Sequence, residues 1–335
     1  KMAREKVNHQ ERISDQLKAK LEPIVEALDN GTADAAEFEM PFSGITCSPY
    51  NAETGHIATG CNALIAMING VQFYSTFQGW EKLGYRVDSK ADFYLARPNT
   101  FKTERVNEKT GETEDVYRVG SFRTYAVWSF ESVRDNLRTP ESDAAWEAKG
   151  PRNTVRNKIP AQPWTPPPAP TVDRTVPNAR VEALKDALVS DGLTFERTAD
   201  SRAYYNETAD KVHMPNRDLF RATKTSTATG CHDSTMLHEF GHATKHKTRL
   251  NREDYKVKGK NASYAYEELV AEITAIMLCA QYGVTPSLRM DHLHYIKSWL
   301  QALNNDSKFV FSAGAKAQAA VDYMNGLTNE SLVAA

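Results

Sequence analysis

The sequence of 335 residues lacks any long apolar run, and no stretch reaches the about 18 consecutive apolar residues expected of a membrane-spanning helix. Its first residues contain no apolar segment of the kind found in secretory signal peptides. Cysteine is also scarce: Cys47, Cys61, Cys231 and Cys279 form neither a CxxC pair nor a dense disulfide pattern. We therefore expect a cytoplasmic protein with reduced thiols and no membrane partner.

The sequence also lacks an excess of charge of either sign. It contains 41 Lys and Arg and 43 Asp and Glu, which gives a formal net charge of -2. No global field therefore draws the molecule onto nucleic acid or a membrane surface, and a nucleic-acid site must be a local patch. Hydrophobic residues make up 41% of the chain, which is enough for cores, and the length suits two domains.

Proline is concentrated in one segment, because nine of the 15 prolines lie in residues 139–177. Proline lacks a backbone N–H and restricts the residue before it, so this segment suits neither a sheet nor a long helix. We predict a Pro-rich linker at 139–177 that separates a domain of residues 1–138 from one of residues 178–335. The alternative is an ordered strap packed across one domain, for which Trp164 offers an anchor.

The N-terminal part combines helices with strands. Its first helix is predicted from apolar residues at helical spacing, and NALIAMING and STFQGWEKLGY indicate two more. DFYLARP, TEDVYRVG and FRTYAVWSF have the β-branched and aromatic composition of strands, and VNEKTGET suits a hairpin tip. We therefore predict a small antiparallel sheet with helices. The apolar stripe of the first helix consists of Ile13, Leu17, Leu21, Ile24 and Leu28.

The C-terminal part is predicted to be mainly helical with a small sheet. NARVEALKDALVSDG has an apolar helical face and a C-terminal stop at Gly192. RAYYNETADKVHMP indicates a strand, a turn and a second strand, and helical patterns dominate beyond about residue 231. The fold class of the whole chain is therefore predicted to be α+β.

The segment HEFGH carries His238 and His242 four residues apart, with Glu239 between them. Positions i and i+4 lie nearly above one another on a helix, so two imidazoles can point at one metal ion. Glu239 projects beside that ion, where it can accept a proton from a metal-bound water, as in HExxH hydrolases. The alternative is an ordinary helix with two incidental histidines. Gly241 allows another element to pack closely.

A third ligand is expected from the acidic and apolar run EELVAE, at residues 267–272. Glutamates inside an apolar helix are costly unless they are paired or bound to metal. Glu268 is the favoured ligand, Glu267 is its rival, and Glu272 is placed to orient a ligand histidine through its second nitrogen. The pattern resembles the gluzincin arrangement. We expect Zn²⁺, although these donors also accept Mn²⁺ or Co²⁺.

Neighbouring groups have weaker claims to a role. Tyr264, one turn before Glu268, is a candidate for stabilising an oxyanion, with a buried core tyrosine as the alternative. His246 continues the i+4 series, yet it is expected to lie too far along the helix to bind the ion. KVHMP is a candidate edge strand for an extended peptide substrate. His213 and His232 are expected to be structural.

Taken together, these segments resemble the ArdC-type antirestriction proteins of plasmids and phages. In the C-terminal part the resemblance rests on AYYNETADKVHMP, STMLHEFGHATKHKTRLNR, YAYEELVAEITA and HYIKSWLQAL. In the N-terminal part it rests on PYNAETGHIATGCNALI, STFQGWEKLGY and FRTYAVWSFESV. These matches cover most of the chain outside the linker.

The resemblance implies a single-stranded-DNA-binding domain tethered to a zincin-like metallopeptidase domain, similar to the SprT-like proteases. It implies metal ligation by His238, His242 and Glu268, with Glu239 as the base, and a role in protecting incoming DNA from restriction. The expected partners are single-stranded DNA and a protein substrate or restriction-system component. Candidate DNA-binding residues are Asn62, Phe77, Trp80, Lys82, Arg86, Arg118, Arg123 and Tyr125.

The sequence departs from the family in its charge. Where the family carries a basic stretch, this chain has DSKADFY, with Lys90 as its single positive charge, and residues 1–138 contain 17 Lys and Arg against 20 Asp and Glu. Single-strand binders combine a positive groove with stacking aromatics. Two alternatives therefore stay open: a DNA-binding protein whose metal is structural, and a peptidase whose first domain binds protein.

Overall fold

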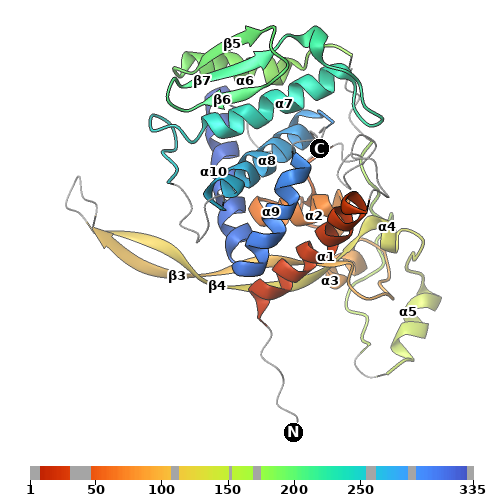
Figure 1. Cartoon of the computed structure of the whole chain (residues 1–335). Helices are drawn as coiled ribbons and strands as arrows, with labels where there is room; N and C mark the ends of the chain where they lie inside the picture. Colours follow the sequence, from red (N-terminus) through yellow and green to blue (C-terminus); the bar gives the residue numbers. More distant parts are fainter. Residues whose placement is uncertain are drawn as a thin grey trace.

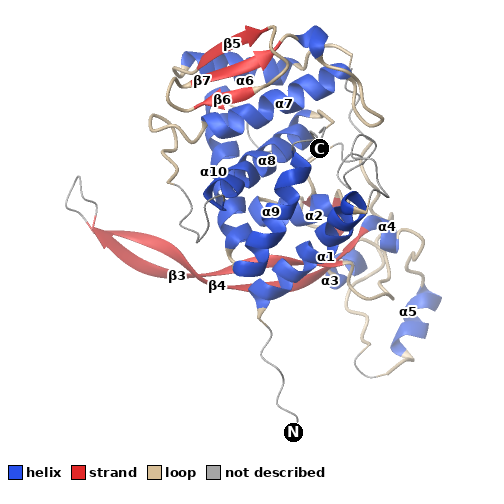
Figure 2. Cartoon of the chain, in the orientation of Figure 1, coloured by secondary structure: helices blue, strands red, loops and turns tan. Residues whose placement is uncertain are grey.

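A computed structural model gives the protein an α+β architecture, as the sequence predicts, with helices packed against two small sheets (Figure 2). Among the helices it describes, none combines the length and the apolar character needed to cross a membrane. The structure describes residues 8–30, 47–106, 113–150, 153–168, 175–253, 262–285 and 292–329.

The first sheet has the strand order β1-β2-β4-β3. It is not purely antiparallel, because β1 and β2 pair in parallel. TEDVYRVG and FRTYAVWSF form one long strand, β4, which pairs with β3 in a two-stranded ribbon that extends away from the helices (Figure 1). Of the predicted hairpin tip, residues 107–112 lie outside the described residues. The strands are β1 (Tyr50–Asn51), β2 (Phe73–Ser75), β3 (Phe93–Val106) and β4 (Thr113–Ser129).

Side-chain amides cover the free edge of β3. Gln16 of α1 (His9–Asp29) exchanges two hydrogen bonds with the backbone of Tyr94, of 2.6 and 3.0 Å. Asn62 of α2 (Gly60–Ile68) does the same with Ala96, both at 2.8 Å. These amides satisfy backbone groups that an edge strand leaves unpaired. The structure thus gives the Asn62 amide a role at the edge of β3, and DNA binding by this residue stays a prediction.

One hydrophobic core runs through both halves of the chain. The apolar stripe of α1 is buried, with Ile13 fully so, and the same cluster includes α2, the base of the ribbon, and α8 to α10. The side chain of Leu28 lies outside the described residues. Gly60 and Gly314 mark the closest approach of α2 to α10 (Phe309–Thr328), since a Cβ added at Gly314 would meet the Cys61 nitrogen at 2.4 Å.

The proline-rich segment is an ordered strap over residues 153–168, which is the alternative that its tryptophan suggested. The Trp164 ring packs edge-on against Phe73 and Trp80. The backbone N–H of Trp164 donates to Leu83, and its carbonyl accepts from the Tyr85 hydroxyl at 2.6 Å. The other elements between the ribbon and the second half are α3 (Phe77–Lys82), α4 (Phe130–Val133) and α5 (Pro140–Glu147).

The second half stacks helices beneath a three-stranded sheet of order β5-β7-β6 (Figure 1). Strand β7 is central, so the expectation that KVHMP offers a free edge to a peptide is wrong. The strand–turn–strand prediction is confirmed by β6 and β7, whereas β5 was not predicted. The remaining elements are α6 (Ala179–Ser190), β5 (Thr194–Thr198), β6 (Tyr204–Asn206), β7 (Lys211–Pro215), the 3₁₀ turn Arg217–Leu219, α7 (Ala228–Ala243), α8 (Ala262–Tyr282) and α9 (His292–Asn305).

Candidate metal centre

Helix α7 presents two histidines to the interior. It begins at the cap residue Thr227, whose side chain accepts from the Gly230 N–H, and it is buried along most of its length. His238 and His242 lie one turn apart, and their Nε2 atoms are separated by 3.1 Å. The i+4 spacing therefore places both ring nitrogens at one point, as the sequence predicts.

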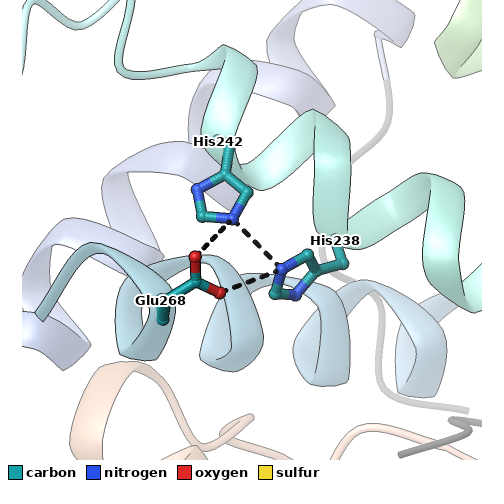
Figure 3. Close-up of side chains that lie close together, drawn as sticks. All are labelled: His238, His242 and Glu268. Atoms are coloured by element: carbon teal, nitrogen blue, oxygen red, sulfur yellow. Dashed lines mark hydrogen bonds and ion pairs between the residues drawn. The ribbon is translucent and has the colours of Figure 1, made fainter. Parts of the chain in front are cut away.

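Helix α8 brings Glu268 to the same point. Its two carboxylate oxygens lie 3.5 Å from Nε2 of His238 and 3.7 Å from Nε2 of His242 (Figure 3). Zinc bonds of about 2.0–2.2 Å place the donor atoms of a tetrahedral site about 3.3–3.6 Å apart. The observed separations are close to these edges, so the three side chains fit one divalent ion.

The two helices meet at Gly241. A Cβ added there would lie 3.0 Å from the Ala271 Cα and 3.1 Å from the Ala271 carbonyl oxygen. Gly241 follows the first histidine by three residues, and Ala271 follows Glu268 by three. The close approach expected from this glycine is confirmed, and it sets the distance between the histidines and the glutamate.

The outward nitrogen of each histidine faces a second carboxylate. Nδ1 of His238 lies 3.2 Å from Glu272, and Nδ1 of His242 lies 3.5 Å from Oε1 of Glu267. A proton on each Nδ1 leaves the lone pair on Nε2, which is the tautomer a metal ligand needs. Glu272 thus occupies the predicted position. Glu267, the rival ligand, lies on the Nδ1 side of His242, away from the three converging donors.

These contacts shift the titration of the cluster in the absence of an ion. Burial alone lowers the pKa of His238, but the hydrogen bonds to Glu268 and Glu272 outweigh it and raise the pKa to about 10. Burial likewise lowers the pKa of His242, and Glu267 and Glu268 raise it to about 9. Burial raises the pKa of Glu268, yet the two histidines hold it well below its ordinary value. The metal-free cluster is therefore ionic, and a bound ion takes the place of protons.

Glu239 and Tyr264 differ in their surroundings. Glu239 lies beside the first histidine on α7 and is 3% exposed, so it is held within the protein next to the cluster. Tyr264 lies on α8, one turn before Glu268, and is 59% exposed. It is therefore not the core tyrosine of the alternative interpretation, and its catalytic role stays a prediction.

Three further histidines of this half, His213, His232 and His246, make structural contacts. His232 is fully buried between Asp233, at 2.8 Å, and Arg197, at 2.9 Å. His213 stacks on a tyrosine ring of β6, with centroids 4.4 Å apart. His246 bonds Thr248 and lies beyond the end of α7, apart from the three converging donors.

Two candidate DNA-binding residues are core residues instead. Trp80 is fully buried and donates its indole N–H to the Trp128 carbonyl at 2.9 Å, so its ring offers no stacking surface. Arg86 is 7% exposed and forms ion pairs with Glu81 and Asp143. Both predictions are therefore wrong, because burial and pairing leave no surface for a nucleic acid.

The other candidates are at least partly accessible. Lys82 pairs with Glu53, and Phe77 packs edge-on against Trp128. Tyr125 is partly buried, and burial raises its pKa. Arg118 and Arg123 are exposed on the ribbon.

Sequence reasoning missed Arg97 and Arg252. Arg97 is exposed and lies directly opposite Arg123 in the register of the ribbon. The sequence feature that could have identified Arg97 is the alternation of DFYLARP, which puts residues 93, 95 and 97 on one face of the strand. Arg252 is buried and pairs with Glu267, 15 residues later. No local pattern reveals that contact, since it depends on how α8 returns to α7.

Comparison with known proteins links the segment that carries the candidate metal centre to a metallopeptidase family. Residues 182–316 match the family model MPTase-PolyVal, described as a zincin-like metallopeptidase. The chain is 35% identical over 178 residues to the uncharacterized protein y4eC of Sinorhizobium fredii. This match covers 53% of the chain and 54% of y4eC. The chain is also 33% identical over 144 residues to DNA primase TraC of Escherichia coli. This match covers 43% of the chain and 13% of the primase. The chain thus spans about half, or less, of these curated relatives.

Solved structures extend the comparison to nearly the whole chain. The metal-free crystal structure of the antirestriction protein ArdC from plasmid R388 matches with a TM-score of 0.57 and 25% identity, over 94% of this chain and 98% of that one. The Mn(II)-bound structure of the same protein gives 0.58 and 24%, over 93% and 97%. The chain therefore shares the fold of the ArdC structure over nearly its whole length, and its second half is similar to a family of zincin-like metallopeptidases.

Proposed function

We propose that this chain is a metal-dependent peptidase with zinc at His238, His242 and Glu268. The observation that carries the proposal is the convergence of two Nε2 atoms and one carboxylate at separations of 3.1 to 3.7 Å. The carboxylates of Glu272 and Glu267, which face the Nδ1 atoms of the two histidines, also support the proposal. Mn(II) occurs in the structure of the R388 relative, and the same donors accept Mn²⁺ or Co²⁺.

In this proposal the chain's own residues place and move a proton. An ion held by the three ligands supplies Lewis acidity and lowers the pKa of a bound water. Glu239, buried beside the ligands, accepts the proton of the attacking water and returns it to the leaving nitrogen. The buried ligands exclude bulk water, which strengthens the electrostatic interactions in the site.

Metal analysis of purified protein tests the ligand set. We expect about one equivalent of ion in the wild type and none in the double variant His238→Ala with His242→Ala. His246→Ala is the matched control, since this histidine follows the same helix outside the cluster, and it should retain the ion. A wild type that binds no divalent ion would contradict the proposal.

Glu239→Gln separates a catalytic from a structural metal. We expect the variant to fold and keep its ion while its peptide hydrolysis falls by about 100-fold or more, because the general base is lost. The proposed role is protection of incoming DNA from restriction, with a restriction-system component as substrate. The efficiency of DNA transfer into a restricting host measures this protection. Full protection by Glu239→Gln would favour a non-proteolytic protein with a structural metal.

A second proposed function, binding of single-stranded DNA, is supported by the β3–β4 ribbon. Arg97 and Arg123 lie directly opposite one another, and Phe101 lies opposite Arg118 four residues further along β3, past a shift in register after Asn99. Like charges at opposed positions destabilise a strand pair unless an anion joins them. The Phe101 ring is 53% exposed and lies over Gly120, where an added Cβ would meet it at 3.0 Å. Guanidinium groups beside an exposed ring suit phosphates and bases.

Oligonucleotide binding across a salt series tests the ribbon. The double variant Arg97→Gln with Arg123→Gln should bind a labelled single strand more weakly and lower the salt slope by about 1.4, as two phosphate contacts predict. Lys102→Gln is the control, because Lys102 lies on the same ribbon but pairs with Asp115 at 2.7 Å. No binding by the wild type at low salt would favour a first half that binds protein.

A further inference from the structure

Glu267 stands out because it adjoins a proposed ligand without joining the three converging donors. Its Oε1 lies 3.5 Å from Nδ1 of His242, and its side chain is 16% exposed. A carboxylate held opposite Nδ1 fixes both the position of the Nδ1 proton and the plane of the imidazole ring.

Arg252 holds that carboxylate in place. Its side chain is 3% exposed, and Nη2 donates to Oε1 of Glu267 and to the Gly241 carbonyl, the latter at 3.1 Å. Its Nη1 donates to the Thr244 hydroxyl. One guanidinium thus joins the last turn of α7 to the first turns of α8. The rigid fork of arginine suits this task, since several fixed partners surround it.

We propose that Arg252 and Glu267 form a positioning pair that orients His242 and thereby sets the affinity of the chain for its ion. Arg252 acts through Glu267: it keeps the carboxylate on the Nδ1 side of His242, where the carboxylate accepts a hydrogen bond from the Nδ1–H group. His242 is then left with its Nε2 lone pair directed at the site. The inference rests on the proposed metal centre and concerns residues outside its ligand set.

Zinc and cobalt binding to metal-free protein tests the pair. A chelator competition gives the zinc dissociation constant, and the visible spectrum of Co²⁺ reports ligand geometry without any assay of activity. We expect Glu267→Ala and Arg252→Met each to weaken zinc binding about 10- to 100-fold and to alter the cobalt spectrum. Glu196→Ala is the matched control, because Glu196 also lies 3.5 Å from a histidine Nδ1, that of His213, and it should bind like the wild type.

The double variant decides whether Arg252 acts through Glu267. If it does, adding Arg252→Met to Glu267→Ala weakens zinc binding no further, whereas independent effects multiply. Circular dichroism confirms that each variant is folded. Unchanged zinc binding in Glu267→Ala, or a double variant that loses the product of the single effects, overturns the inference while leaving the metal centre intact. A wild type without any ion binding would instead refute the metal centre itself.

Discussion

The close contact between α7 and α8 at Gly241 lets us predict how Gly241→Ala changes the geometry of the candidate site. The new methyl group would lie 3.0 Å from the Ala271 Cα, whereas an ordinary contact begins at 3.4 Å. Relief therefore needs about 0.4 Å of movement between the helices. That exceeds the about 0.2 Å within which metal–ligand distances hold. Because the histidines lie on one helix and Glu268 on the other, the movement separates the donors.

Two energies of opposite sign decide the stability of this variant. Overpacking a core contact costs about 1–3 kcal/mol. Alanine in place of a helical glycine recovers about 1 kcal/mol. We expect a net loss of up to about 2 kcal/mol in the free energy of unfolding of the metal-free protein, measured by urea denaturation. Zinc binding should weaken by about tenfold or more, as for a disturbed ligand set.

Gly326→Ala provides the control for this reasoning. Gly326 lies in α10 with nothing within 4 Å of an added Cβ, so only the helix-propensity term applies. This variant should be more stable by about 0.5–1 kcal/mol and bind zinc as the wild type does. If Gly241→Ala behaves like Gly326→Ala in both measurements, the close contact does not set the geometry of the site.

Three further predictions concern the first half. Trp80→Ala should lower the free energy of unfolding in urea by about 3–5 kcal/mol, since the ring is fully buried. Trp164→Ala should cost about 2–3 kcal/mol, because its ring is only partly buried, and should speed limited proteolysis within residues 153–168. Arg138, followed by Arg86, lowers the pKa of Asp143 below its ordinary value of 3.8. The stability that Asp143 contributes should therefore be present above about pH 4 and lost as pH falls through the lowered pKa, so Asp143→Asn and the wild type converge in acid.

The convergence of His238, His242 and Glu268 is the feature of the candidate site that the sequence predicts best. The i+4 spacing of His238 and His242 fixes their relation on any helix, and the acidic residues in the apolar run 267–272 need a partner. Spacing does not determine which of the two adjacent glutamates faces the Nε2 atoms of the histidines. Adjacent positions differ by 100° around a helix, so the choice between Glu267 and Glu268 depends on how α8 is rotated against α7.

The wrong predictions of DNA-binding residues have a different physical cause. Trp80 and Arg86 have the composition of a nucleic-acid site, but composition does not reveal burial. One of the two acidic partners of Arg86, Asp143, lies 57 residues away on a helix that was expected to be linker. The role of the Asn62 amide at the edge of β3 is likewise absent from the local sequence, since only the tertiary fold brings the two together. Contacts between distant segments decide these roles, and no local period encodes them.

The paired glycines between α2 and α10 have a consequence for how the protein melts. Because Gly60 and Gly314 let the two backbones touch, opening either half exposes apolar surface of the other. The free energy of unfolding is then a property of the whole chain, and heating should give one cooperative transition. We therefore expect a substitution that loosens α2 to affect the candidate metal centre through α10 and α8, although it touches neither histidine.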